Sequence, residues 1–195
     1  MAERLSTIKR QKQIIDEAIR IIHEKGFASL SIRELAKNVG ISEPAIYRHF
    51  NSKEDIVIGI LDRMLEFGNF IENNIKDIEN PLEKIRQFIF LHIELLEKNP
   101  QMTSVIFSED IFQPDEVINV KLQMIFRKRH SLLNSIINEA IEKGFIIRVE
   151  AEEIGNIILG YLHLVIREWR QSHFSFLLMD KATKLVNLLE QIIFV

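Results

Sequence analysis

The segment at residues 29–53, SLSIRELAKNVGISEPAIYRHFNSK, constrains the fold of this chain more than any other part. Ser31 is a favourable N-cap residue, and Glu34, three residues later, is placed to complete a capping box. The apolar residues that follow recur at the spacing of a single helix face. A first helix is therefore predicted at about residues 32–38.

A glycine turn and a second helix are expected next. Gly40 can adopt a positive φ without steric cost. Ser42 is a second N-cap candidate, and Pro44 lies in the first turn, where its missing N–H costs nothing. The second helix is predicted at about 43–49. A pair of helices joined in this way is the construction by which a helix-turn-helix places one helix in the major groove of DNA.

The polar and aromatic side chains of the second helix allow two interpretations. Tyr47, Arg48 and His49 are consecutive, so a helix spreads them over a wide arc and at least two must face outward. In an ordinary helical hairpin they would simply be solvated, because short motifs produce false matches. In a helix-turn-helix they would face DNA.

The wider segment IIHEKGFASLSIRELAKNVGISEPAIYRHFNSKEDI closely resembles the N-terminal domain of TetR-family transcriptional regulators. The resemblance covers roughly residues 10–60 in detail, and beyond them it extends only to length and an all-helical pattern. The features that carry it are Gly26-Phe27, the pair Ser29 and Ser31, Ile32 with Leu35-Ala36, Gly40-Ile41-Ser42, and Tyr47-x-His49-Phe50 followed by Ser52-Lys53.

The resemblance implies that the second helix enters the major groove of DNA. By position, Tyr47, His49 and Lys53 match residues that contact phosphate. Arg33 matches a position that often reads a base edge, where it could grip guanine. Glu43 has two readings, because it could accept a hydrogen bond from cytosine N4 or only stabilise the helix N-terminus. The predicted DNA-binding residues are Ser31, Arg33, Ser42, Glu43, Pro44, Ala45, Tyr47, Arg48, His49 and Lys53.

Composition narrows the class of protein. The chain has 195 residues with 47% apolar content, enough to bury a sizeable core, and it contains no cysteine. The absence of cysteine excludes disulfides, thiolate metal sites and a cysteine nucleophile. It is also compatible with a reducing cytoplasm, which is the location that we expect. No apolar run is long enough to span a membrane, and the charged N-terminus does not look like a secretory signal.

The net charge of −3 is unevenly distributed. Residues 1–53 carry a net charge of +4, and the remaining residues carry −7. This asymmetry fits a chain in which one end meets phosphate and the other stays away from it, although chance segregation could also produce it.

Helix start and stop signals predict an all-α fold of about nine helices. We expect an N-terminal three-helix DNA-binding domain at 1–52 and an effector-binding and dimerisation domain at 53–195. The run Phe145–Val149 is β-prone but is expected to have no partner strand. The helices are predicted at about 7–25, 32–38, 43–49, 53–79, 81–99, 101–109, 115–143, 151–172 and 178–193.

The region after residue 53 is rich in phenylalanine. Any one of these side chains could simply fill the core, but the resemblance implies a largely apolar pocket between helices that binds a small effector. A lipophilic effector is expected, such as a fatty acid, a fatty acyl thioester or an aromatic molecule. The cluster Arg127–His130 could receive the phosphates of an acyl-CoA, or it could be a solvated or salt-bridged face. The predicted pocket residues are Phe67, Phe88, His92, Phe107, Phe126, His163 and Trp169.

The last two helices carry a strong apolar pattern. The resemblance implies that they pair with those of a second subunit, so that a two-fold homodimer reads a near-palindromic operator in double-stranded DNA. Alternatively, the stripe covers only the core of its own subunit. Repression is the commoner outcome in the family and is expected here. The predicted interface residues are Ile154, Ile158, Leu162, Val165, Leu185, Leu188, Leu189 and Ile192.

Two other classes of protein fit the sequence less well. The sequence contains no HExxH, GxSxG or phosphate-loop motif, so we expect no enzyme activity, no metal and no cofactor. The alternative to a DNA-binding regulator is a helical carrier of lipids or small molecules, or an interaction module, without DNA readout. The complete set of residues from Tyr47 to Lys53 argues against that alternative.

Overall fold

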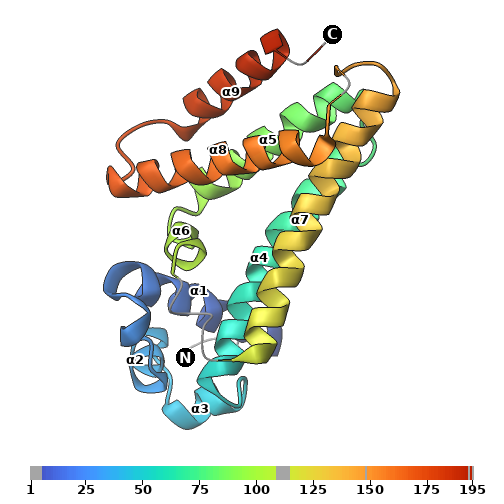
Figure 1. Cartoon of the computed structure of the whole chain (residues 1–195). Helices are drawn as coiled ribbons and strands as arrows, with labels where there is room; N and C mark the ends of the chain where they lie inside the picture. Colours follow the sequence, from blue (N-terminus) through green and yellow to red (C-terminus); the bar gives the residue numbers. More distant parts are fainter. Residues whose placement is uncertain (1–5, 109–114, 148, 193, 195) are drawn as a thin grey trace. The chain divides into compact units, whose positions relative to one another are not determined.

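The protein is all-α. The computed structural model describes residues 6–108, 115–147, 149–192 and 194, and every structural statement below concerns these residues. The predicted class of about nine helices is confirmed, and no helix in this part of the chain is long and apolar enough to cross a membrane. The helices are α1 (Thr7–Lys25), α2 (Ile32–Val39), α3 (Glu43–Tyr47), α4 (Lys53–Ile75), α5 (Pro81–Lys98), α6 (Met102–Ile106), α7 (Glu116–Glu142), α8 (Ala151–Gln171) and α9 (Leu178–Ile192), with a 3₁₀ turn at Phe27–Ser29 (Figure 1).

Side-chain caps mark the start of several helices. Ser52 Oγ accepts a hydrogen bond from the Asp55 N–H at the start of α4 (3.2 Å), and Asn80 Oδ1 accepts one from the Leu82 N–H at the start of α5 (2.9 Å). Helix α3 is shorter than the predicted 43–49. Its last turn is tightened by a bond from the His49 N–H to the Ile46 carbonyl (2.8 Å), as is common where a helix ends.

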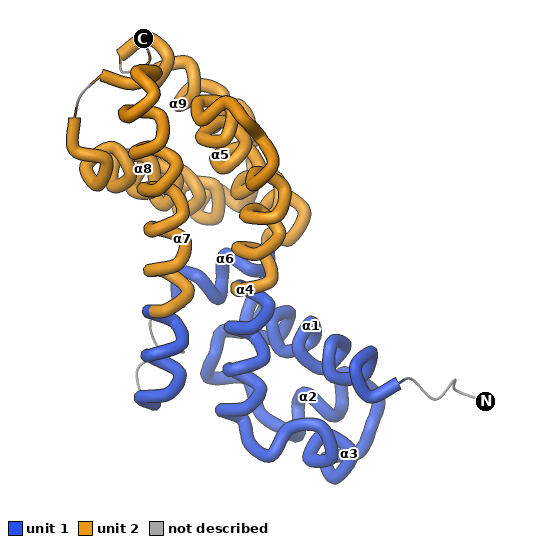
Figure 2. The backbone as a smooth tube through the Cα atoms, turned by 90° about the vertical axis from the view of Figure 1, so that its right-hand side faces the viewer, with its two compact units in different colours: residues 1–64, 101–123 blue, residues 65–100, 124–195 orange. Residues whose placement is uncertain are grey.

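The chain forms two compact units (Figure 2). Unit 1 comprises residues 1–64 and 101–123, and unit 2 comprises residues 65–100 and 124–195. The boundary therefore falls inside α4 and α7, whereas the sequence predicted a division after residue 52. The first half of α4 belongs to unit 1 because its apolar face, including Ile56 and Ile60, is buried there. The functional division at 52 stays a prediction.

Unit 1 is organised around α1, which packs against the 3₁₀ turn, α2 and α6. Most of its isoleucines face the core, and Ile14 and Ile21 are fully buried, whereas Ile8 near the start of the helix is exposed. A polar contact fastens α6 to α1, because His23 Nδ1 lies 2.8 Å from the hydroxyl of Ser104, which is almost completely buried. The helices of unit 1 thus pack around a scaffold with a satisfied polar contact inside it.

Unit 2 is a bundle in which both α5 and α8 pack against α9. Helix α5 contributes Phe88, whose side chain is fully buried. Helix α7 contributes Ile125, Leu133 and Ile137, which recur at the spacing of one helix face.

The β-prone run Phe145–Val149 forms no strand among the described residues, as expected, but one of its residues makes an isolated bridge. Ile146 forms a single antiparallel bridge with Phe194 near the C-terminus. The partner is far away along the chain, so no local pattern could indicate it. One bridge does not make a strand, and the helical class is unaffected.

Candidate functional site

The predicted helix-turn-helix is present in unit 1. Gly40 has left-handed backbone angles (φ 75°, ψ 34°), as the turn requires, and the Ile41 N–H closes that turn by donating to the Ala36 carbonyl (3.0 Å). Ile46 of α3 is fully buried and Ala36 of α2 is nearly so. Because the two helices bury these small and apolar residues, the opposite face of α3 is left for solvent or a partner.

The residues predicted to lead into the major groove lie on that outer face. Ser42, Glu43, Pro44 and Arg48 are exposed and Ala45 is half-buried. Ser42 is the N-cap residue of α3, but its hydroxyl makes no capping bond, contrary to the prediction. Tyr47 has an exposed fraction of 51%, which is unusual for a large aromatic side chain and is compatible with a contact to another molecule.

His49 and Lys53 are held more firmly. The His49 carbonyl accepts a hydrogen bond from Gln11 Nε2 (3.3 Å), which ties the end of α3 to α1. The His49 Nδ1 atom is buried and has no hydrogen-bond partner among the described residues. Lys53 Nζ lies 4.2 Å from the centre of the Phe27 ring, a cation–π contact that orients the ammonium group at the start of α4.

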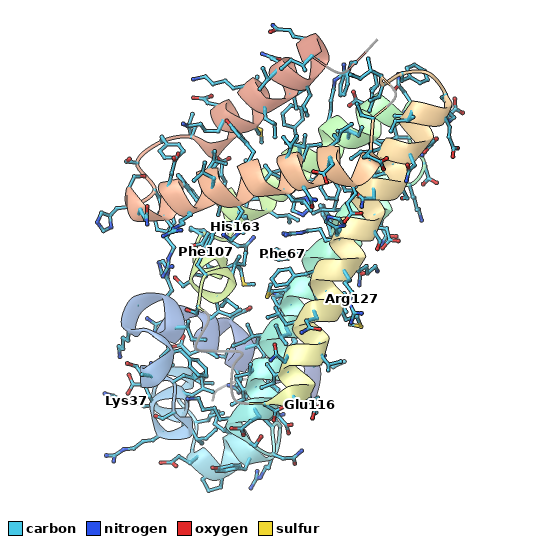
Figure 3. The ribbon with its side chains drawn as sticks, in the orientation of Figure 1. Lys37, Phe67, Phe107, Glu116, Arg127 and His163 are labelled. Carbon is cyan, nitrogen blue, oxygen red and sulfur yellow. The ribbon has the colours of Figure 1, made fainter. Side chains whose placement is uncertain are left out.

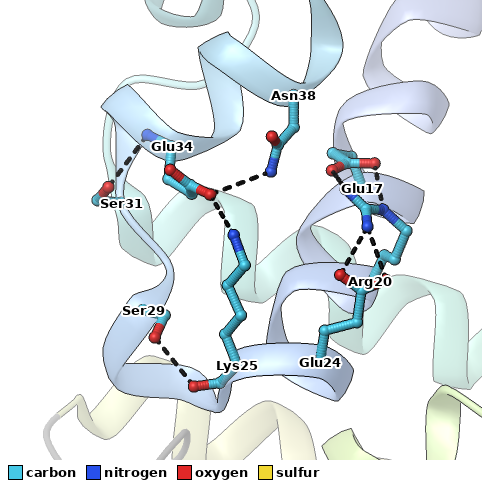
Figure 4. Close-up of polar contacts among 8 residues, drawn as sticks. All are labelled: Glu17, Arg20, Glu24, Lys25, Ser29, Ser31, Glu34 and Asn38. Atoms are coloured by element: carbon cyan, nitrogen blue, oxygen red, sulfur yellow. Dashed lines mark hydrogen bonds and ion pairs between the residues drawn. The ribbon is translucent and has the colours of Figure 1, made fainter.

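The start of α2 differs in one respect from the predicted capping box (Figure 4). Ser31 Oγ accepts a hydrogen bond from the Glu34 N–H (3.1 Å), as expected. The Glu34 carboxylate does not return to Ser31. It pairs with Lys25 and accepts a hydrogen bond from Asn38, and the contact with Lys25 holds the pKa of Glu34 below its ordinary value. The capping box is therefore half-formed, because a long cation from α1 competes for the carboxylate.

Lys37 is a candidate that the sequence analysis missed. It is exposed on α2 four residues after Arg33, which is also exposed (Figure 3). Side chains four residues apart lie on the same helix face, so two cations share one side of α2. The signal was present in the sequence as the spacing between the two basic residues.

The predicted pocket residues fall into both units. Phe107, at the C-terminal end of α6, belongs to unit 1, and the other six belong to unit 2. Phe88 and Trp169 are buried, His92 and Phe67 are half-buried, and His163 is exposed. The Trp169 indole N–H is buried without a hydrogen-bond partner in the described part of the chain. The side chain of Phe126 is partly exposed, with an exposed fraction of 36%.

The basic cluster Arg127–His130 does not act as one surface. Arg127 is exposed, and Lys128 pairs with Glu72 (2.9 Å) and donates to Asn69 Oδ1 (2.7 Å). Arg129 turns inward instead: it is half-buried, and its guanidinium carbon lies 5.5 Å from the centre of the Phe126 ring. Burial lowers the pKa of Arg129.

The sequence contained a signal for the burial of Arg129. It lies four residues after Ile125 and four before Leu133, both of which are buried, so it occupies a position of the apolar stripe of α7. Taken together with its basic neighbours, Arg129 resembles a surface residue, and only its place in the apolar stripe indicates that it faces inward.

His92 is a neutral imidazole beside this arginine. Its Nδ1 lies 2.9 Å from the Phe88 carbonyl, which can only accept, so Nδ1 carries the proton and Nε2 has the lone pair. Its ring centre is 4.4 Å from that of Phe88. Burial, with a smaller effect from the positive charge of Arg129, lowers the pKa of His92 to about 3. Burial and the charge of Arg129 also lower the pKa of His163.

The lowered pKa of His92 predicts a loss of stability in acid. Since the unfolded chain takes up this proton near pH 6.5 and the folded chain only near pH 3, the stabilising effect is present above pH 6.5 and is lost as the pH falls. Between pH 7 and pH 5 the expected share is about 2 kcal/mol. Urea unfolding at pH 7 and pH 5 should show that the wild type loses about 2 kcal/mol more of its free energy of unfolding than His92→Gln does. Equal pH dependence in both proteins would contradict the assignment.

The predicted dimer residues divide into two groups. Ile158 and Leu162 of α8 are buried within unit 2, as are Ile154, Val165, Leu185 and Leu189, which supports the alternative that their stripe covers the subunit's own core. Leu188 and Ile192 of α9 are exposed, and Ile157 and Leu164 of α8, which are not in the predicted interface set, form a second exposed apolar row. The dimer interface stays a prediction, now assigned to these exposed residues.

Two family models match the chain. Residues 14–60 match the model described as "Bacterial regulatory proteins, tetR family", and residues 60–192 match the model described as "YsiA-like protein, C-terminal region". The two matches meet inside α4 and together cover most of the described structure.

Individual relatives agree with these matches. The fatty acid metabolism regulator protein of Bacillus subtilis is 26% identical over 93% of this chain and 95% of its own length. The nucleoid occlusion factor SlmA of Vibrio campbellii is 27% identical over 86% of this chain and 87% of its own. The crystal structure of the transcriptional regulator FadR from Bacillus subtilis in complex with stearoyl-CoA superimposes with a TM-score of 0.80 at 25% identity, covering 91% of this chain and 96% of that one.

Proposed function

Because the chain belongs to the TetR family of bacterial regulatory proteins, we propose that it is a ligand-responsive transcriptional repressor that works in the cytoplasm. It binds a near-palindromic operator as a homodimer and leaves it when a fatty acyl ligand binds in unit 2. The observation that best supports DNA binding is the exposed face of α3, on which Tyr47 and Arg48 are both exposed to solvent.

Two groups of side chains divide the work on DNA. Tyr47, His49 and Lys53, with the Ser31 hydroxyl, contact phosphate and set the position of the protein on the duplex. Lys37 adds a further phosphate contact from α2. Arg33 and the first residues of α3 reach the base edges, so they determine which sequence is bound.

The effector is proposed to be an acyl-CoA. The relative in Bacillus subtilis is a fatty acid metabolism regulator, and a similar FadR structure holds stearoyl-CoA. The aromatic side chains of unit 2, including Phe67 and Phe88, supply apolar surface suited to an acyl chain. An acyl ligand that favours one spacing of the two DNA-binding heads would lower operator affinity by population shift.

The proposal is tested by selecting binding sites from random duplex DNA with protein from which bound lipids have been stripped. A palindrome should be enriched, and stearoyl-CoA should release the protein from it. Failure to enrich any sequence, in folded dimeric protein, would contradict the DNA-binding proposal and favour the carrier alternative. If a palindrome were enriched but stearoyl-CoA did not release the protein from it, the proposed effector would be wrong. That result would favour a function closer to that of the nucleoid occlusion relative.

Tyr47→Ala should weaken binding to every DNA sequence by roughly tenfold or more, because it removes a hydrogen bond to a charged phosphate. Arg33→Ala should instead relax the preference at one base position, at a cost of about 1–3 kcal/mol for the preferred base. Fluorescence anisotropy with the selected operator and with single-base variants separates the two effects. If Arg33→Ala weakened binding to all sequences equally, its assignment to a base edge would be wrong.

A further inference from the structure

Arg129 is a half-buried cation with an unused hydrogen-bond donor at its buried Nε atom. Its Nε atom is buried, and no described residue accepts a hydrogen bond from it. The neighbouring positions in α7 are different: Lys128 pairs with Glu72, and His130 Nε2 lies 2.9 Å from Asn156 Oδ1. Arg129, which points inward, is therefore the residue of this basic run with a buried donor that no described residue accepts.

Several carboxylates of unit 2 pair with other cations. Glu139 pairs with Lys84 (2.7 Å) and Lys143 (2.6 Å), and Glu190 pairs with Arg86 (2.7 Å). Among the described residues no acidic side chain forms an ion pair with Arg129, and burial alone accounts for its lowered pKa. A guanidinium removed from water without a counter-ion is costly to the fold. Such a cost is commonly retained where the charge is used to bind something.

The surroundings of Arg129 are aromatic and uncharged. The centre of the Phe126 ring lies 5.5 Å from its guanidinium carbon, and His92, which is near enough to be affected by its charge, is neutral and packs against Phe88 with its ring tilted. His92 also presents an acceptor at Nε2, because its Nδ1 proton goes to the Phe88 carbonyl. In this cluster Arg129 alone carries a charge, next to rings suited to methylene groups.

We propose that Arg129 anchors the anionic headgroup of the acyl ligand, and that Phe88 and Phe126 border the chain next to it. The inference rests on the proposed function, because it supposes an acyl effector in unit 2. It adds that the site selects ligands by negative charge. A free carboxylate and a CoA phosphate offer the same chemistry to the guanidinium, whereas a neutral lipid leaves it unpaired.

The test is direct binding to lipid-stripped protein, followed by the fluorescence of Trp169, the single tryptophan of the chain, which lies in unit 2. The probes are stearoyl-CoA, stearate and the neutral stearamide. The variants are Arg129→Gln and, as a matched control, Arg127→Gln, which removes the same charge from an exposed position of the same helix.

Arg129→Gln should weaken binding of the anionic probes by at least about 30-fold and leave stearamide unchanged, whereas Arg127→Gln should have little effect. Loss of stearate alone would identify a carboxylate as the headgroup, and loss of stearoyl-CoA alone would identify a phosphate. Wild-type affinity of Arg129→Gln for both anionic probes would overturn the inference. If the wild type bound no acyl probe, the acyl effector and the inference would both be overturned, and that outcome is visible before any substitution is made.

A second variant separates binding from folding. Arg129→Met should raise the melting temperature of the ligand-free protein by roughly 2–4 °C, because it removes an unpaired buried charge. It should also abolish the rise in melting temperature that stearoyl-CoA causes in the wild type. A lower melting temperature without ligand, together with an unchanged response to stearoyl-CoA, would assign Arg129 a purely structural role.

Discussion

Introducing glutamate at both Leu164 and Leu188 should convert the protein to a monomer and weaken its binding to operator DNA by about 100-fold or more. The exposed fractions of these side chains are 53% and 49%, and Ile157 and Ile192 beside them on α8 and α9 are exposed to 62% and 61%. Four exposed apolar side chains on two adjacent helices form a surface suited to a second copy of the same face.

The size of the effect follows from charge and from geometry. A carboxylate in an apolar dimer interface would lose its water without gaining a partner. A monomer would also bind one half-site at a time and lose the effective concentration that a dimer provides. Sedimentation velocity and operator binding measured on the same samples would detect both changes.

Val117→Glu is the matched control, because this side chain of α7 is equally apolar and 64% exposed but lies outside the proposed interface. It should remain dimeric and bind DNA normally. A dimeric Leu164→Glu/Leu188→Glu protein would show that the exposed face of α8 and α9 is not the interface.

Phe88→Ala should destabilise the protein by about 3–5 kcal/mol. The ring of Phe88 is fully buried and contacts the tilted ring of His92, so truncation leaves a cavity at the aromatic cluster that α5 helps to form. A loss of this size is a large part of the stability of an ordinary domain. Urea unfolding at a fixed protein concentration, followed by Trp169 fluorescence, would measure it.

Phe70→Ala provides the comparison for that substitution. Phe70 is also a phenylalanine of unit 2, but 48% of its side chain is exposed, so its truncation should change stability by no more than about 0.5 kcal/mol. If the two variants unfolded at the same urea concentration, Phe88 would not be a core residue.

Most of the helical architecture was predictable because its causes are local. Helix α1 begins and ends where the sequence predicted, since the capping residue, the apolar spacing and Gly26 all lie within or beside the helix. The turn at Gly40 was predictable for the same reason, because a positive φ is a property of one residue. The exposed position of Tyr47 followed from the burial of Ile46 beside it on a short helix.

Predictions that depended on a choice of partner were less secure. The Glu34 carboxylate had a plausible partner within its own helix, but Lys25 from α1 takes it. The single bridge from Ile146 was not foreseen, because its partner Phe194 lies far away along the chain. The apolar stripe of α8 could serve the subunit's own core or a second subunit, and periodicity alone describes both cases equally well.

The sequence by itself therefore determined the helices, the turn between α2 and α3 and the exposed aromatic and basic residues of α3, because capping, glycine conformation and periodicity act over a few residues. Only the tertiary structure decided that Arg129 faces inward without a counter-ion, that His92 stays neutral, and which face of α8 and α9 remains uncovered. Burial and electrostatic pairing are set by residues brought together from distant parts of the chain, and their free energies depend on that environment rather than on neighbours in sequence.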